Sequence, residues 1–177
     1  MTAEAIIRWA VPGDAGHIVR LIRALAAYEN EPASSVKVTE ADILRDGFGL
    51  LDGDQGQPDR RFECLIAEHG GVPVGLCLFF HNYSTWEGRA GLYVEDLFVE
   101  PTLRGQGLGR DLMAAVARVA LDRGCARVDL SVLDWNPTRA FYDRIEMIHM
   151  EAWRPYRMEQ DAITTLARAA PKISGGD

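Results

Sequence analysis

The sequence lacks the features that mark several large classes of protein. Its 19 Lys and Arg residues are outnumbered by 26 Asp and Glu residues, and the net charge of −7 argues against nucleic acid as a partner. No apolar run approaches the ~20 residues that a membrane-spanning helix needs, and no secretory leader precedes Ile6. We therefore expect a cytoplasmic protein that binds neither nucleic acid nor membrane.

Cysteine and histidine are also sparse. The three cysteines, Cys64, Cys77 and Cys125, are odd in number and widely spaced, and each lies in an apolar run. This pattern indicates reduced thiols inside a core, as in a cytosolic protein. The four histidines are scattered without metal-ligand spacing, so no metal site is predicted.

What the sequence contains is typical of one globular domain. Its 177 residues suffice for a full hydrophobic core, and its apolar content of 47% and charged content of 25% are ordinary. It shows no repeat and no linker-like shift of composition. We expect a single domain over residues 1–177, with 171–177 as a loose tail.

The most informative stretch is 92–123. Residues 92–100 are mostly apolar, aromatic or β-branched, interrupted by two acids, and predict a strand. Pro101 ends the strand because proline has no N–H to donate to a neighbouring strand. Residues 108–123 carry apolar side chains at helical spacing, and Gly124 follows as a typical helix end.

Three alternating glycines, Gly105, Gly107 and Gly109, join this strand to the helix. Without Cβ atoms they let an anion approach the backbone, where the free N–H groups and the dipole of the helix hold it. Arg104 and Arg110 add positive charge. A P-loop needs a Lys after its last glycine, and the dinucleotide fingerprint needs a third glycine where Arg110 stands, so neither fits. The pattern predicts a phosphate site; a glycine-rich turn that merely starts a helix is the alternative.

The rest of the chain predicts a mixed sheet. Further strands are expected at 6–9, 62–67, 72–80, 126–133 and 153–158, further helices at 14–28, 39–44, 137–145 and 160–170, and surface loops at 51–60 and 81–88. Asp14 is expected to cap the first of these helices, and Gly75 inside a strand indicates a bulge or a close neighbour. The order of elements predicts an α/β (α+β) fold with a mixed, largely antiparallel sheet and helices on both faces.

The segment 104–109 matches the Arg/Gln-x-x-Gly-x-Gly/Ala signature of the GCN5-related N-acetyltransferases (GNAT family), in which it binds the pyrophosphate of acetyl-CoA. The resemblance extends over nearly the whole chain and is strongest for the spermidine/spermine (diamine) and thialysine acetyltransferases. Besides the signature, it is carried by Tyr28-Glu29, Asp46–Gly49, Trp86, Tyr93–Asp96, Trp135-Asn136, Phe141-Tyr142 and Trp153-Arg154. It implies the GNAT fold, acetyl-CoA as cosubstrate, a small-molecule amine as acceptor and a homodimer.

The resemblance also implies which residues bind the two substrates. On the acetyl-CoA side these are Leu97, Phe98, Val99, Arg104, Gly105, Gln106, Gly107, Leu108, Gly109, Arg110, Asn136 and Tyr142. On the amine side they are Tyr28, Glu29, Ser84, Trp86, Glu95, Asp96, Glu151 and Trp153. Asn136 directly precedes a proline and is also expected to cap the helix that follows.

Two of these residues are expected to perform the chemistry. A primary amine arrives protonated, with an ordinary pKa of ~10.4, so a base must take its proton before the amine attacks the thioester. Glu95 is the predicted base, directly or through a water, and Asp96 is the second choice. In a regular strand these two side chains face opposite sides, but the family has a bulge here. Tyr142 matches the family's general acid, which protonates the departing thiolate.

The acceptor stays open among a polyamine or diamine, a thialysine- or lysine-like amino acid, and a protein amine. Polyamines come first, although polyamine enzymes of this type carry Asp where Ser84 stands. The glycine that the family has soon after its Phe-Tyr pair is missing, so the turn after Tyr142 must differ. Outside catalysis, the alternatives are a silent acyl-CoA sensor, against which Glu95 and Tyr142 argue, and a structural partner protein.

Overall fold

The computed structural model describes residues 5–50 and 60–171. It divides into two compact units, Met1–Arg139 and Ala140–Asp177, which we describe separately. Most of the loop predicted at 51–60, and most of the tail predicted at 171–177, lie outside the described residues. That the whole chain acts as a single domain stays a prediction.

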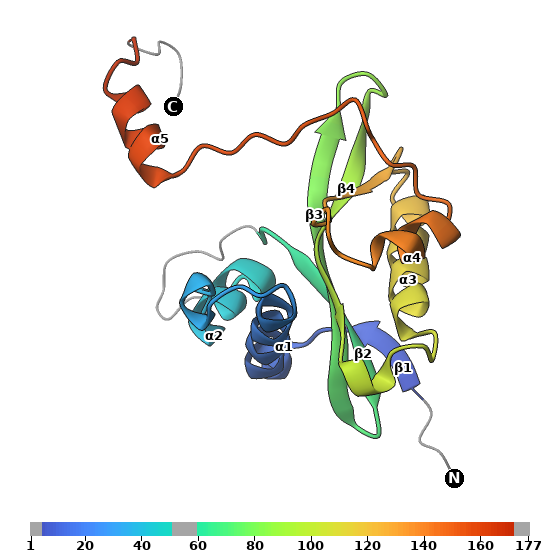
Figure 1. Ribbon diagram of the computed structural model, residues 1–177. Coiled ribbons are helices and arrows are strands. Elements are labelled where there is room, and N and C mark those ends of the chain that lie inside the picture. The colour runs from blue at the N-terminus through green and yellow to red at the C-terminus, as the bar shows by residue number, and fades with distance from the viewer. Residues whose placement is uncertain (1–4, 51–59, 172–177) are drawn as a thin grey trace. The chain divides into compact units, whose positions relative to one another are not determined.

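A five-stranded sheet forms the centre of the first unit (Figure 1). Its strands are β1 (Ala5–Trp9), β2 (Glu63–His69), β3 (Val72–Ser84), β4 (Arg89–Val99) and β5 (Val128–Leu130), in that spatial order. The first three pairings are antiparallel and the last, between β4 and β5, is parallel. The prediction of a mixed, largely antiparallel sheet is confirmed.

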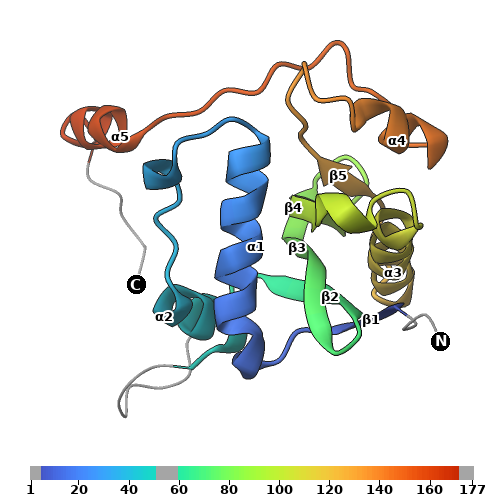
Figure 2. The same ribbon diagram turned by 60° about the horizontal axis from the view of Figure 1, so that its bottom comes forward.

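Helices cover both faces of this sheet, as predicted (Figure 2). On one face lie α1 (Ala15–Tyr28) and α2 (Glu40–Asp42), which continues as a π-helical turn, Ile43–Gly47. On the other face lies α3 (Leu108–Asp122). The apolar stripe of α1 packs on the alternate side chains of β2, β3 and β4 that point its way. The best-buried contacts involve Ile18, Leu21, Ile66, Leu76 and Phe98.

Gly75 shows why this sheet needs a glycine in the middle of β3. A Cβ atom there would lie 2.8 Å from the backbone oxygen of Phe98 and 3.3 Å from the Cβ of Ala67, so β4 leaves no room for a side chain. The pairing of β2 with β3 also shifts register between Ala67 and Glu68. Both parts of the prediction, a bulge and a close neighbour, are confirmed.

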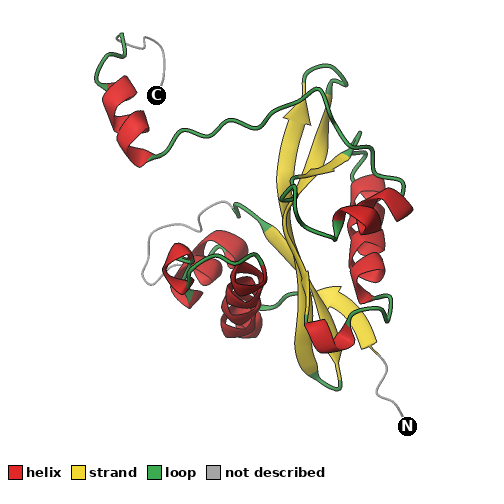
Figure 3. Cartoon of the chain, in the orientation of Figure 1, coloured by secondary structure: helices red, strands yellow, loops and turns green. Residues whose placement is uncertain are grey.

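Three predicted elements differ in the structure. The loop expected at 81–88 shrinks to its last four residues, because His81–Ser84 continue β3 and pair with Arg89–Leu92. The strand expected at 126–133 pairs only over Val128–Leu130. The strand expected at 153–158 is wrong: the segment lies in loop (Figure 3). Pro155 has no N–H for a ladder, and the helices α4 (Arg139–Arg144) and α5 (Gln160–Ala167) of its own unit offer no strand edge.

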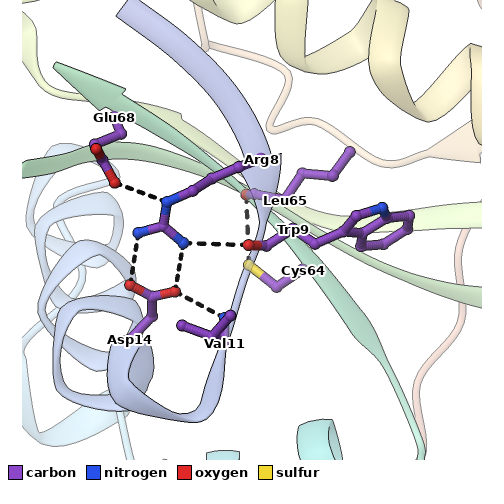
Figure 4. A network of polar contacts seen from close by, with 7 residues as sticks. All are labelled: Arg8, Trp9, Val11, Asp14, Cys64, Leu65 and Glu68. Atoms are coloured by element: carbon purple, nitrogen blue, oxygen red, sulfur yellow. Dashed lines mark hydrogen bonds and ion pairs between the residues drawn. The ribbon is translucent and has the colours of Figure 1, made fainter. Parts of the chain in front are cut away.

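The start of α1 is fixed by an ion-pair network (Figure 4). Arg8 on β1 donates to both carboxylate oxygens of Asp14, at 2.7 and 2.9 Å, and to Glu68 on β2 at 2.7 Å. Asp14, which is buried, also accepts from the backbone N–H of Val11 at 2.8 Å. Asp14 does stand at the N-cap of α1, as expected, but its carboxylate points back to Val11 and Arg8 instead of capping the helix.

We predict that Asp14→Asn destabilises the fold by roughly 1–3 kcal/mol at neutral pH, since it removes one charge of a largely buried pair. The Arg8 guanidinium holds the pKa of Asp14 below its ordinary 3.8. A depressed pKa stabilises the fold above the unfolded-state value, and that stability is lost as pH falls through the folded-state value. The difference in urea unfolding between wild type and variant should therefore shrink below pH 3.8.

The matched control is Asp122→Asn, which breaks the exposed pair of Asp122 with Arg118 on α3. An exposed pair contributes less than about 0.5 kcal/mol. Equal losses in the two variants, or a gap for Asp14→Asn that persists below its folded-state pKa, would show that the network adds nothing through charge.

Candidate active site

The site is built around an extra residue in β4. Leu78 of β3 pairs with Asp96, whereas its neighbour Phe79 pairs with Val94, so Glu95 has no opposite residue. This bulge leaves Glu95 exposed, and it turns Asp96 to the face that carries α1, on which Phe98 also lies. The two acids of the strand therefore occupy different environments.

The bulge also marks the point where β4 and β5 separate. β5 pairs with Leu92–Val94 only, while β4 continues to Val99. Within residues 5–50 and 60–171, no strand runs beside β4 beyond Val94 on that side. The predicted cofactor residues Leu97, Phe98 and Val99 lie on this free length of strand. An extended ligand that bears amide groups is able to pair with such an edge.

The glycine loop follows directly. Gly105 and Gly107 have φ values of 79° and 92°, which only glycine adopts without strain. A Cβ atom on Gly105 would have nothing within 4 Å, and one on Gly107 only a carboxylate oxygen of Asp111 at 3.9 Å. The space over the loop is thus open. Gly109 lies inside the first turn of α3.

Helix α3 presents free N–H groups to this space. Gly107 is its N-cap, and the first helical hydrogen bond runs from the N–H of Asp111 to the oxygen of Gly107 at 3.0 Å. The N–H groups of residues 108–110 therefore precede the helical hydrogen bonds and can bind an anion. Arg110 is exposed in the same turn. The residues present fit the pyrophosphate of acetyl-CoA.

Arg104, although exposed, makes contacts that the sequence did not indicate. Its Nε donates to the backbone oxygen of Val99 at 3.0 Å. Its guanidinium carbon lies 4.2 Å from the centre of the Tyr28 ring and 5.5 Å from that of Phe98. The stacking of Arg104 on Tyr28 joins segments far apart in the sequence, so no local sequence pattern predicts it.

Tyr28 and Asn136 meet on the same side of the sheet. The Tyr28 hydroxyl donates to Oδ1 of Asn136 at 3.4 Å, and that oxygen also accepts from the N–H of Thr138 at 2.9 Å. Asn136 is buried and accepts from the N–H of Thr138 in the turn before α4. The helix begins at Arg139 instead of Pro137, so Asn136 stabilises the turn that leads into the helix and not its first residue.

Three acids predicted to bind the amine, Glu29, Glu95 and Asp96, interact electrostatically near the C-terminal end of α1. Burial, together with the negative charges of Glu95 and Glu29, raises the pKa of Asp96 to about 6. Burial, followed by the charge of Glu31, also raises the pKa of Glu29. Carboxylates that repel one another in a partly buried place form an attractive site for a cationic amine.

The structure separates two predicted substrate residues from these acids. Ser84 is buried at the far end of β3, where its hydroxyl accepts from the N–H of Glu87 at 3.2 Å and from Arg127 at 3.3 Å. Trp86 in the following turn is 87% exposed. Leu78 on β3 is the partner of Asp96, and Ser84 follows Leu78 by six residues on the same strand. At about 3.3 Å per residue, Ser84 lies roughly 20 Å from Leu78. Within one chain, Ser84 and Asp96 do not line the same pocket.

Tyr142, Glu151 and Trp153 belong to the second unit. Tyr142 is half-buried in α4, where its ring meets Phe141 edge to face at 5.2 Å. The chain turns after α4 without a glycine: Glu146 adopts φ 63°, and the N–H of Met147 bonds to the oxygen of Tyr142 at 3.1 Å. Glu146 thus takes the left-handed position that usually needs glycine. Glu151 and Trp153 are exposed, and all three functional roles stay predictions.

The remaining polar groups suggest no other chemistry. In the described part of the chain, no three His, Cys, Asp or Glu side chains gather in a way that holds a metal, and no helix is long and apolar enough to cross a membrane. Burial raises the pKa of the Cys77 thiol to about 12 and also raises that of Cys64, so neither is a ready nucleophile.

Comparison with known proteins agrees with this geometry. Residues 19–147 match the acetyltransferase (GNAT) family. The chain is 39% identical to the thialysine N-epsilon-acetyltransferase of Sus scrofa, over 93% of this chain and 98% of that one. It is 31% identical to the Homo sapiens spermidine/spermine N(1)-acetyltransferase-like protein 1, over 91% of this chain and 23% of that protein. A solved aminoglycoside N-acetyltransferase in complex with CoA superposes with a TM-score of 0.68 at 20% identity, covering 90% of this chain and 98% of that chain.

The mixed sheet that opens between β4 and β5 beside the glycine loop is shared with solved acetyltransferases, and it is the fold of the family that residues 19–147 match. The chain belongs to the GNAT family, and it is an acetyl-CoA-dependent N-acetyltransferase. The expected fold, activity and cosubstrate are confirmed.

We predict that Gly107→Val weakens acetyl-CoA binding at least tenfold, about 1.4 kcal/mol, because the new side chain fills the open space over the loop. Isothermal titration calorimetry measures this directly. The matched control is Gly71→Val in the turn between β2 and β3, where φ is 80° and the space is also empty. Both variants carry similar backbone strain, but only the first should lose affinity. Equal affinities would contradict a pyrophosphate site at the loop.

Proposed function

We propose that the protein transfers acetyl directly from acetyl-CoA to the primary amine of a small substrate that carries further charge. The observation that supports this acceptor is the group of carboxylates formed by Glu29, Glu95 and Asp96 beside the free edge of β4. A cation gains from all three charges, and each exposed pair contributes about 0.2–1 kcal/mol.

Two acceptor classes fit this group. The sequence alone favours polyamines and diamines, with thialysine-like amino acids second. Two observations now favour the amino acid. Ser84, which stands where polyamine enzymes carry Asp, has its hydroxyl engaged in the hairpin turn. The Sus scrofa relative named for thialysine matches almost end to end. A protein amine is the third candidate.

The acceptor's proton goes to a carboxylate of β4. Glu95 remains our first candidate because its side chain is exposed on the bulge, open to an incoming amine. Asp96 is second; its pKa of about 6 lies closer to neutral than that of an ordinary carboxyl, which suits a general base. A limb of the pH–kcat/KM profile near pH 6 that disappears in Asp96→Asn, but not in Glu95→Gln, would move the role to Asp96.

The transfer needs no acyl-enzyme. Acetyl-CoA supplies an activated thioester. The N–H of Glu100 bonds to β3, and alternate N–H groups of a strand face the same way, so those of Leu97 and Val99 face the free edge of β4. We expect them to stabilise charge on the carbonyl oxygen of the thioester. The buried thiols of Cys64 and Cys77 are poor nucleophiles. Tyr142 donates the proton that the leaving thiolate takes up, because a phenol remains protonated at neutral pH.

We also propose a homodimer. The hairpin that carries Ser84 and Trp86 cannot reach Asp96 of its own chain, so these residues can serve an amine site only in a second copy. Sedimentation equilibrium should give twice the chain mass of 19.6 kDa at assay concentration. A mass of 19.6 kDa in a fully active sample would remove Ser84 and Trp86 from the site.

Tyr142→Phe tests the general acid. We predict that kcat falls roughly 100-fold, within the usual range for losing a general acid, while the melting temperature changes little. Tyr156→Phe removes a phenolic hydroxyl from an almost fully exposed ring of the same unit and serves as control. A Tyr142→Phe variant that melts earlier but turns over normally would make Tyr142 a packing residue.

The decisive experiment on the acceptor compares kcat/KM for thialysine, lysine, a short diamine and spermidine under one set of conditions. We predict that thialysine exceeds spermidine more than tenfold, about 1.4 kcal/mol of transition-state binding. The reverse order would assign a polyamine acceptor and leave the acetyltransferase intact. No turnover of any of these amines would refute a small-molecule acceptor.

A further inference from the structure

We propose that Arg104 is a positioning residue that ties the acetyl-CoA loop to the acceptor side of the site through Tyr28. The inference deepens the proposed function and rests on it. It assigns the first residue of the glycine signature a task other than contact with phosphate.

The contacts of Arg104 fix its guanidinium in place. Its Nε–H is committed to the backbone oxygen of Val99, at the end of β4. The guanidinium carbon lies over the Tyr28 ring, 4.2 Å from its centre, and 5.5 Å from the centre of the Phe98 ring. A cation at this distance from an aromatic face attracts it, and a planar guanidinium also stacks on it.

Tyr28 connects Arg104 to α1 and to Asn136. It is the last residue of α1, and its hydroxyl reaches the buried Asn136, which caps the turn before α4. The next residue, Glu29, carries one of the two charges that act on Asp96. Arg104, Tyr28 and Asn136 thus connect four segments: the end of β4, the turn before the glycine loop, the end of α1 and the segment after β5.

Loss of the stack would therefore displace Glu29 as well as the loop. The substitution Arg104→Lys would keep the charge, but a lysine side chain has neither the Nε–H that bonds Val99 nor a plane to lay on Tyr28. Arg110, exposed in the first turn of α3, is the other cation beside the loop. The two arginines then have different roles: Arg110 lies beside the pyrophosphate, and Arg104 fixes the position of Tyr28 and Glu29 on the amine side of the site.

The test uses two acetyl donors. Acetyl-CoA carries the pyrophosphate, whereas S-acetyl-pantetheine has the same thioester and no phosphate. We expect Arg104→Lys to lower kcat/KM for the amine about tenfold with both donors, mainly through a higher KM for the amine. Arg110→Met should lower kcat/KM more with acetyl-CoA than with S-acetyl-pantetheine. If Arg104→Lys loses activity only with acetyl-CoA, or loses none, the positioning role is refuted.

A double-mutant cycle locates the effect on the Tyr28 ring. In a Tyr28→Phe background, which keeps the ring, Arg104→Lys should still cost about tenfold; in a Tyr28→Leu background it should cost almost nothing further. Equal losses in both backgrounds would refute coupling through the ring, and melting temperatures show whether each variant folds. A wild type inactive on every amine would overturn the proposed function and this inference together, whereas an active wild type with additive variants overturns this inference alone.

Discussion

One extra residue in β4 controls the arrangement of the site. Because Glu95 has no partner on β3, the strand changes register in its middle, and the side chains beyond it face the opposite way to a regular strand. Asp96 then shares the α1 face with Phe98, and β5 pairs with β4 only before the shift. The length of β4 after the bulge leads into the glycine loop and α3. The proposed site for both substrates thus lies where the sheet itself leaves an edge of β4 unpaired.

The burial of Asp96 places a negative charge in the site and lowers the stability of the fold near neutral pH. Burial is the main cause that raises the pKa of Asp96 from its ordinary 3.8 to about 6. A raised carboxyl pKa means that the fold is most stable below the unfolded-state value and loses that stability as pH rises through the folded-state value. Near neutral pH the ionised Asp96 therefore opposes folding, with Glu95 and Glu29 beside it. The cationic amine of the proposed function would relieve this repulsion. By contrast, the paired acid Asp14 lies at the other end of α1 and supports the fold.

Local patterns predicted what local chemistry determines. The space over Gly105 and Gly107 is open, as expected of residues without Cβ atoms, and Asn136 caps the turn before α4. Features that depend on distant partners were out of reach. Polar side chains at His81–Ser84 looked like a loop because the paired strand was not visible in the sequence. The stacking of Arg104 on Tyr28 joins residues far apart in the chain. Residues 153–158 have a strand-like composition, but their own unit supplies no edge to pair with.

The central claim is that acetyl-CoA lies along the free edge of β4 with its pyrophosphate on the glycine loop. Amide hydrogen exchange with and without saturating acetyl-CoA tests it most directly, since a ligand that accepts hydrogen bonds slows exchange of the N–H groups that donate them. The account predicts slower exchange at Leu97, Val99 and residues 105–110, and little change in β1 and β2. Saturated binding without protection at either segment, or protection confined to β1 and β2, would contradict it.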